Sequence, residues 1–138
     1  MQSKAVLGQQ EVARIIDRAR EEAQRNKWDV AIAVVDDGGH PLGLERLDGC
    51  APIGAYIAQE KARSAALGRR ETRGYEEMVN GGRTAFVSAP LLTSLEGGVP
   101  VLVDGQVVGA VGVSGVKAEQ DAQVAKAGIA ALLWAQPV

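Results

Sequence analysis

A lysine stands on the apolar face of an alanine-rich segment. When residues 53–67 are projected as a helix at about 100° per residue, Lys61 falls between Ile57 and Ala65. Its stem can lie on apolar surface with the ammonium in water. Alternatively, the ammonium points into a site, where it would hold an anionic substrate or, after desolvation, act as a base. Ser64 lies one turn further along and would share such a site.

The single histidine and the single cysteine are also candidates for chemistry. His40 closes a turn with the sequence Asp36-Asp37-Gly38-Gly39, and such a histidine is either solvated, a haem axial ligand or a proton carrier. Cys50 is either a small buried residue or a nucleophile or soft ligand, although no second histidine exists to activate it. One Cys and one His are too few for a structural zinc site within one chain.

Two further groups of residues are weaker candidates for a site. Arg46, Asp36 and Asp48 belong to a polar hairpin, where such charges are most often solvated pairs. The backbone N–H groups of Gly97-Gly98 and Ser114-Gly115 lie beside a strand end and a helix start, an arrangement that can cradle an anion. Turn chemistry explains these glycines equally well, because the P-loop and dinucleotide-binding spacings are absent.

These candidates are positioned by a regular series of elements in the first half of the chain. Apolar residues at helical spacing predict an amphipathic helix over residues 9–26. A nearly continuous apolar run at 30–36, the Gly-rich turn and residues 41–48 predict a hairpin. Residues 53–67 predict a largely buried helix, with Gly68 as its left-handed C-terminal residue.

The second half repeats the pattern of hairpin and helix. Residues 71–80 have weak helical character, and residues 83–95 are predicted as a loop with a short strand. Residues 99–103 and 106–113 predict a second hairpin, with a type I′ turn at Asp104-Gly105. A final helix over 118–134 follows. The order of elements predicts an antiparallel sheet with helices packed against it, a single α+β domain over residues 1–138. The apolar face expected for the final helix comprises Ala122, Ala125, Ile129, Leu132 and Leu133.

Composition narrows the possible partners. The chain has 138 residues, 46% of them hydrophobic, which is enough for one packed core. A net charge of -2 and a pI near 5.4 argue against a nucleic-acid partner, which would need a basic stripe. No apolar run approaches the ~20 residues that cross a bilayer, and no leader is evident. We therefore expect no membrane contact and a cytoplasmic protein, which a lone cysteine also favours.

Several short motifs follow one another along the chain in a specific order and spacing. The motifs are Val34-Val-Asp-Asp-Gly-Gly-His40, Arg46-Leu-Asp48, Lys61-Ala-Arg-Ser-Ala65, Gly97-Gly-Val-Pro100, Asp104-Gly105, Val108-Gly-Ala-Val-Gly-Val-Ser-Gly115 and Gln120-Asp121. Taken together they resemble the GlcG/HbpS-like family, also called haem-degrading domains, and the resemblance covers nearly the whole chain. It implies a profilin-like fold with a sheet of about five antiparallel strands flanked by helices, assembled into dimers or larger symmetric oligomers.

The resemblance also implies a pocket between the Gly-rich hairpin and the helix that carries Lys61. Family members often have Thr at the position of Ser64, so the hydroxyl is kept. His40 is the implied ligand of haem iron, but a single histidine cannot form a two-histidine site within one chain. The few aromatic residues, 4% of the chain, also leave few rings to stack on a porphyrin. The pocket residues implied are Asp36, His40, Arg46, Lys61, Ser64, Gly97, Gly98, Pro100, Ser114 and Gly115.

Three functions are compatible with the sequence. The first is a small-molecule binding protein for haem, another tetrapyrrole or a small organic acid. The second is a cofactor-independent isomerase, hydratase or lyase on a carbonyl or carboxylate compound, in which Lys61 and Arg46 hold negative charge and Asp36 or His40 moves a proton. The third is an oligomeric accessory protein of a metabolic enzyme, with Ile129 and Trp134 at interfaces.

Overall fold

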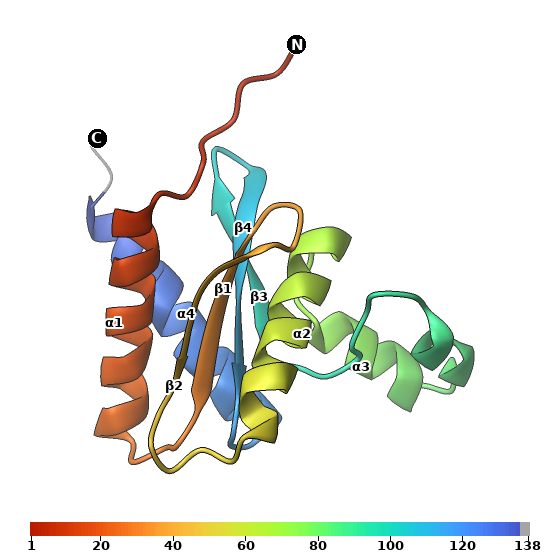
Figure 1. Cartoon of the computed structure of the whole chain (residues 1–138). Coiled ribbons are helices and arrows are strands. Elements are labelled where there is room, and N and C mark those ends of the chain that lie inside the picture. Colours follow the sequence, from red (N-terminus) through yellow and green to blue (C-terminus); the bar gives the residue numbers. More distant parts are fainter. Residues whose placement is uncertain (136–138) are drawn as a thin grey trace.

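Four antiparallel strands form one sheet in the order β2-β1-β4-β3. The strands are β1 (Ala31–Asp36), β2 (Pro41–Arg46), β3 (Gly98–Val103) and β4 (Gln106–Ser114). Figure 1 shows this sheet in a computed structural model that describes residues 1–135, with side chains described to residue 132. The two predicted hairpins and the α+β class are confirmed, while the described residues contain four strands where the resemblance implies about five.

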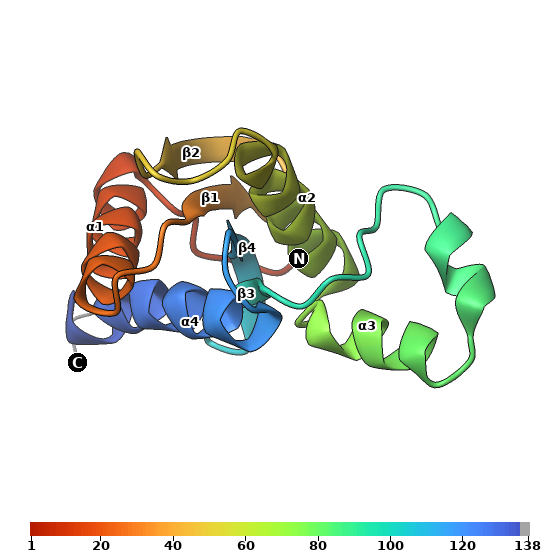
Figure 2. The same cartoon turned by 90° about the horizontal axis from the view of Figure 1, so that it is seen from below.

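Helices cover both faces of the sheet (Figure 2). Helices α1 (Gln9–Arg25) and α4 (Ala118–Ala135) pack against each other and against one face, where valine and isoleucine side chains form the main core. Helix α2 (Ile53–Gly68) covers the other face through alanines. On α4, Ala122, Ala125 and Leu132 are buried as predicted and Ile129 packs partly buried against the core, whereas the side chains of Leu133 and Trp134 lie outside the described residues.

Glycines allow α2 to approach the sheet at backbone distance. A Cβ atom at Gly112 of β4 would lie 2.1 Å from the carbonyl oxygen of Ala58, and one at Gly98 of β3 would lie 2.2 Å from that of Lys61. Both distances are far below van der Waals contact, so any side chain there would displace the helix. The backbone of α2 therefore lies directly against Gly98 and Gly112.

The backbone conformations predicted at Asp104-Gly105 and at Gly68 can be compared with the structure. Asp104 and Gly105 both have positive φ angles, 52° and 75°, which confirms the type I′ turn between β3 and β4. The prediction that Gly68 ends α2 in a left-handed conformation is wrong, because Arg69 adopts it with φ 58° while Gly68 remains helical. Gly68 is needed for space instead, since a Cβ atom there would lie 1.7 Å from the hydroxyl oxygen of Tyr75.

An arm of residues 69–97 projects from the α2 side of the body (Figure 2). It contains α3 (Arg73–Asn80) and the short 3-10 helix η1 (Thr84–Ser88), which are joined by stacking of Tyr75 on Phe86 with ring centroids 5.2 Å apart. Residues 83–95 hold no strand, so the short strand predicted there is wrong. Thr72 fixes the base of the arm, because its Oγ1 accepts a hydrogen bond from the N–H of Gly98 at 2.9 Å.

Candidate functional site

The ammonium of Lys61 is buried in an ion pair. Its Nζ donates to Oδ2 of Asp121 at 2.9 Å and to the carbonyl of Val113 at 3.0 Å, and the two charged side chains are only 4% and 3% exposed. The other carboxylate oxygen of Asp121 accepts the N–H of Val116 at 3.1 Å. Burial raises the pKa of Asp121, and the charge of Lys61 acts against that rise. The predicted role of Lys61 as a base or anion holder is not supported, because its charge is already neutralised inside the core.

The space that was expected between the Gly-rich hairpin and α2 is filled. A Cβ atom at Gly97 would lie 2.8 Å from Nζ of Lys61, and one at Gly115 would lie 2.3 Å from the carbonyl oxygen of Asp29. The N–H of Gly98 is already bonded to Thr72, and Pro100 pairs with Ala110 inside the sheet. The absence of side chains at these glycines allows close packing, and the N–H of Gly98 is not available to an anion.

Ser64 and Ser114 also have structural partners. The hydroxyl of Ser64, fully buried, donates to the carbonyl of Glu60 and accepts the N–H of Thr93, both at 2.7 Å. Ser64 therefore ties the returning chain of the arm to α2. Ser114 ends β4 buried, with its carbonyl 3.8 Å from the sulfur of Cys50. Burial raises the pKa of the Cys50 thiol, which is the opposite of what a nucleophile needs.

Arg46 lies apart from His40. The two residues stand at opposite ends of β2, and Arg46 is exposed in a groove of about 550 Å³ that Trp28, Asp29 and Asp48 also line. The structure thus brings Asp36 and His40 together, but it does not bring Arg46, Lys61 or Ser64 to them.

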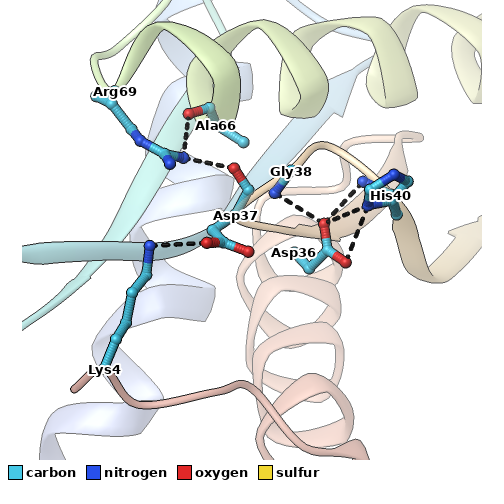
Figure 3. A network of polar contacts seen from close by, with 7 residues as sticks. All are labelled: Lys4, Asp36, Asp37, Gly38, His40, Ala66 and Arg69. Carbon is cyan, nitrogen blue, oxygen red and sulfur yellow. Dashed lines mark hydrogen bonds and ion pairs between the residues drawn. The ribbon is translucent and has the colours of Figure 1, made fainter. Parts of the chain in front are cut away.

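His40 and Asp36 form the exposed pair of the β1–β2 turn (Figure 3). Nδ1 of His40 lies 3.1 and 3.2 Å from the two carboxylate oxygens of Asp36. Oδ1 of Asp36 also accepts the backbone N–H groups of Gly38 and His40, each at 2.9 Å, so the carboxylate itself is fixed. A carboxylate at Nδ1 favours the tautomer that carries its proton there and directs the lone pair of Nε2 outward. The imidazole is 77% exposed, so Nε2 is accessible to a ligand.

Neighbouring contacts hold this turn in place. Lys4 pairs with the carboxylate of Asp37 at 2.7 Å and lowers its pKa, chiefly through that hydrogen bond (Figure 3). Arg69, at the end of α2, donates to the carbonyls of Asp37 and Ala66. The turn is therefore bound to both the N-terminal segment and α2.

Two cavities meet at Pro41, the residue after His40. An open apolar groove of about 630 Å³ lies between the N-terminal segment, α1 and β2. A smaller cavity of about 260 Å³ lies on the side of α2. Sequence reasoning missed both, because nothing in the local pattern shows which surface residues of separate elements meet. The groove is lined mainly by Leu7, Val12, Ala13, Ile16, Pro41, Leu42 and Leu44, and the smaller cavity by Val35, Pro41, Tyr56, Gln59, Glu60 and Arg63.

Within the described residues, no three His, Cys, Asp or Glu side chains gather closely enough to hold a metal ion. Over the same part of the chain, no helix has the length and apolar character needed to span a bilayer.

The fold is that of a small profilin-like α+β domain, here with an exposed His–Asp pair at the edge of its sheet. Residues 7–130 match the family described as haem degrading protein HbpS-like, and the chain belongs to that HbpS-like family. Protein GlcG of Escherichia coli K12 is 72% identical over 114 residues, which cover 83% of this chain and 85% of GlcG.

Solved structures share the fold. The crystal structure of a double mutant of HbpS from Streptomyces reticuli aligns with a TM-score of 0.87 and 29% identity, covering 96% of this chain and 90% of that one. The crystal structure of a complex of PduOC with haem aligns with a TM-score of 0.83 and 25% identity, covering 92% and 95%.

Proposed function

We propose that this protein binds haem at the β1–β2 turn, with His40 as an axial ligand of the iron. The observation that carries the proposal is the fixed, exposed imidazole of His40, whose Nδ1 is held by Asp36. Histidines that bind metals commonly use such a carboxylate partner, which orients the ring and makes its second nitrogen more basic. The description of the family and the haem complex of PduOC support the same ligand.

The surroundings of His40 suit a porphyrin on two counts. The apolar groove beside Pro41 offers aliphatic side chains and a volume of about 630 Å³, a size that accommodates a large flat ligand. The groove is open to solvent along β2, where Leu42 and Leu44 are 40% and 45% exposed. Bound haem would supply an iron centre for ligand exchange or electron transfer. The protein would bind and orient the ring, and the aliphatic side chains would exclude water from one of its faces.

We extend the proposal to a homo-oligomer, a dimer or larger. Ile53 and Tyr56, at the start of α2, are 60% and 69% exposed, and Val87 and Leu91 of the arm are similarly exposed. Apolar side chains exposed in groups are typical of surfaces that another protein covers. A second copy would cover them and could complete the open haem site. Light scattering during size-exclusion chromatography would test this assembly.

The other functions weighed from the sequence have less support in the geometry. A cofactor-independent enzyme would retain the Asp36–His40 pair for proton transfer, but Lys61 is paired in the core and Arg46 stands at the far end of β2. An accessory role would use the same exposed surfaces and remains a prediction, as does a cytoplasmic location.

A hemin titration tests the proposed function. The purified protein should show a saturable shift of the Soret band, and His40→Ala should lose it. Asp48→Asn, an exposed acid near the far end of β2, is the matched surface control and should bind as the wild type does. A shift that His40→Ala retains in full would remove His40 as the ligand. Absence of any saturable shift would refute haem binding.

A further inference from the structure

The smaller cavity beside the β1–β2 turn has the size of a small-molecule site. Its volume of about 260 Å³ lies just below the range of roughly 300–1,000 Å³ that holds drug-sized ligands. It is bounded by Val35 and Pro41 of the sheet on one side and by Tyr56 and Arg63 of α2 on the other. A short carbon chain, or the end of a larger molecule, would fill it.

Arg63 carries an unsatisfied donor at this cavity. Its Nε is buried and has no hydrogen-bond acceptor among the described residues. The stem of Arg63 is packed over the turn, because a Cβ atom at Gly39 would lie 2.8 Å from its Cγ. Buried polar atoms nearly always have a partner, so an orphaned N–H on a side chain that lines a cavity points to a missing acceptor, which a small movement of that side chain would let it reach.

The acceptor that matches Arg63 is a carboxylate. A guanidinium presents its N–H groups as a planar fork, which pairs best with two oxygens held in one plane. One of its Nη groups is now paired with the carboxylate of Glu60. A ligand carboxylate would therefore meet a guanidinium that is only partly neutralised, and it would compete with Glu60 for that group. Val35 and Pro41 would contact the carbon chain behind the carboxylate.

We propose that this cavity binds a carboxylate group, that Arg63 recognises it, and that Glu60 weakens the binding by competing for the guanidinium. The carboxylate belongs either to a free short-chain acid or to a propionate of haem. Recognition of a free acid requires neither iron nor His40 and goes beyond the proposed haem site. Only the propionate source rests on the proposed function.

The first experiment follows the side-chain Nε–H signal of Arg63 by ¹⁵N–¹H NMR while sodium propionate is added at constant ionic strength. A saturable shift is expected with propionate and not with propionamide, which has the same shape but no charge. Because Arg63→Gln lacks the Nε–H signal, binding to the variants is followed through the backbone amide signals of Gly39 and Gln59, which line the same cavity. Arg63→Gln should abolish the saturable shift of these signals, and Glu60→Gln should tighten the binding by on the order of tenfold. Arg73→Gln is the matched control, since Arg73 also pairs with a glutamate on its own helix but lies on the arm.

The second experiment distinguishes the two sources of the carboxylate. Hemin and hemin dimethyl ester, in which both propionates are blocked, are titrated into the wild type and Arg63→Gln. Tighter binding of hemin than of its ester, with the advantage lost in Arg63→Gln, would assign the cavity to a haem propionate. Propionate binding that depends on Arg63, without such an advantage, would assign it to a free acid.

The proposal is overturned if propionate gives no saturable shift and hemin has no Arg63-dependent advantage over its ester. It is also overturned if Arg63→Gln leaves both effects unchanged. Thermal unfolding of Arg63→Gln and of Arg63→Lys, which keeps the charge, shows whether a loss of binding reflects loss of the fold. Failure of the haem proposal is visible separately, because it removes the Soret shift from the wild type.

Discussion

Lys61 and Asp121 form an ion pair of 2.9 Å in the interior, 60 residues apart in the sequence. The pair joins the middle of α2 to the first turn of α4, and the carbonyl of Val113 joins the end of β4 to the same ammonium. A buried charge is stable only while its partners compensate for the lost contact with water. Removing one member of the pair therefore leaves the other without compensation in the core.

Replacing Lys61 by Met should therefore destabilise the protein by roughly 3–5 kcal/mol, because Asp121 loses its counterion and must either stay charged in the core or take up a proton on folding. Urea unfolding at neutral pH measures the change. The double variant Lys61→Met, Asp121→Leu should recover most of that loss, since the unpaired charge is gone. A Lys61→Met variant that unfolds at the wild-type urea concentration would show that the pair contributes nothing to the fold.

The contact of Arg20 with Glu45 predicts a dependence of stability on pH. Arg20 donates to both carboxylate oxygens of Glu45, at 2.7 and 2.9 Å, and this hydrogen bonding lowers the pKa of Glu45. A lowered carboxyl pKa gives a stabilisation that is complete above the unfolded value near 4.5 and is lost as the pH falls through the folded value.

Glu45→Gln should accordingly cost about 0.5–1 kcal/mol at pH 7, a small value because the side chain is about a third exposed. The cost should shrink as the pH falls below 4.5 and should vanish once the pH lies below the lowered pKa of the folded carboxyl. Urea unfolding at pH 7 and at an acidic pH well below 4.5 makes the comparison. Asp17→Asn, which removes the more exposed partner of Arg20, serves as the control. If Glu45→Gln costs the same free energy of unfolding at both pH values, the contact of Glu45 with Arg20 is not the cause of the pH dependence.

Gly98 should not tolerate a methyl group. A Cβ atom there would lie 2.2 Å from the carbonyl oxygen of Lys61, so Gly98→Ala must push α2 from the sheet at a cost of about 3 kcal/mol or more. Gly81→Ala is the matched control, because its nearest contact would be 3.2 Å and its φ is -78°. Thermal unfolding of both variants measures the difference, and similar melting temperatures would show that α2 adjusts freely.

Ser64 should control the order of the arm. Ser64→Ala removes the acceptor of the Thr93 N–H, and the lost hydrogen bond should cost about 1 kcal/mol locally. Amide hydrogen exchange should then rise in the chain around Thr93 while β1 and β4 stay protected. Ser88→Ala, which removes a hydroxyl bonded only to the backbone carbonyl of Ala85, is the control. Unchanged exchange around Thr93 would mean that other contacts hold the arm.

Asp36 should act on haem through His40. Asp36→Asn keeps the shape of the side chain but removes the charged acceptor that holds Nδ1 of His40 and orients the ring, so hemin affinity should fall by about 10–100-fold. Absorbance titrations of the wild type and Asp36→Asn with hemin at the same pH give the ratio of the two affinities. Asp37→Asn, whose carboxylate pairs with Lys4 instead, is the neighbouring control. Equal affinity in wild type and Asp36→Asn would separate the carboxylate from the haem site.

The sequence by itself determined most of the elements. Helix-period and strand-period patterns reflect local geometry and burial, so the long helices, the two hairpins and the turn at Asp104-Gly105 could be predicted without knowing their neighbours. The contact of His40 with Asp36 also follows from a short turn, because the two residues are only four positions apart in the sequence. The unusual position of Lys61, a charge on the apolar face of a helix, could also be seen from the helical period alone.

Only the tertiary structure decided what those residues do. Asp121 lies 60 residues from Lys61, and no local pattern shows that the two meet in the core. The cavity around Arg63 likewise depends on how α2 packs beside the β1–β2 turn. Long-range packing decides which charges are neutralised and which remain accessible. It buries Lys61 in an ion pair and leaves His40 exposed, so the candidate site lies at His40.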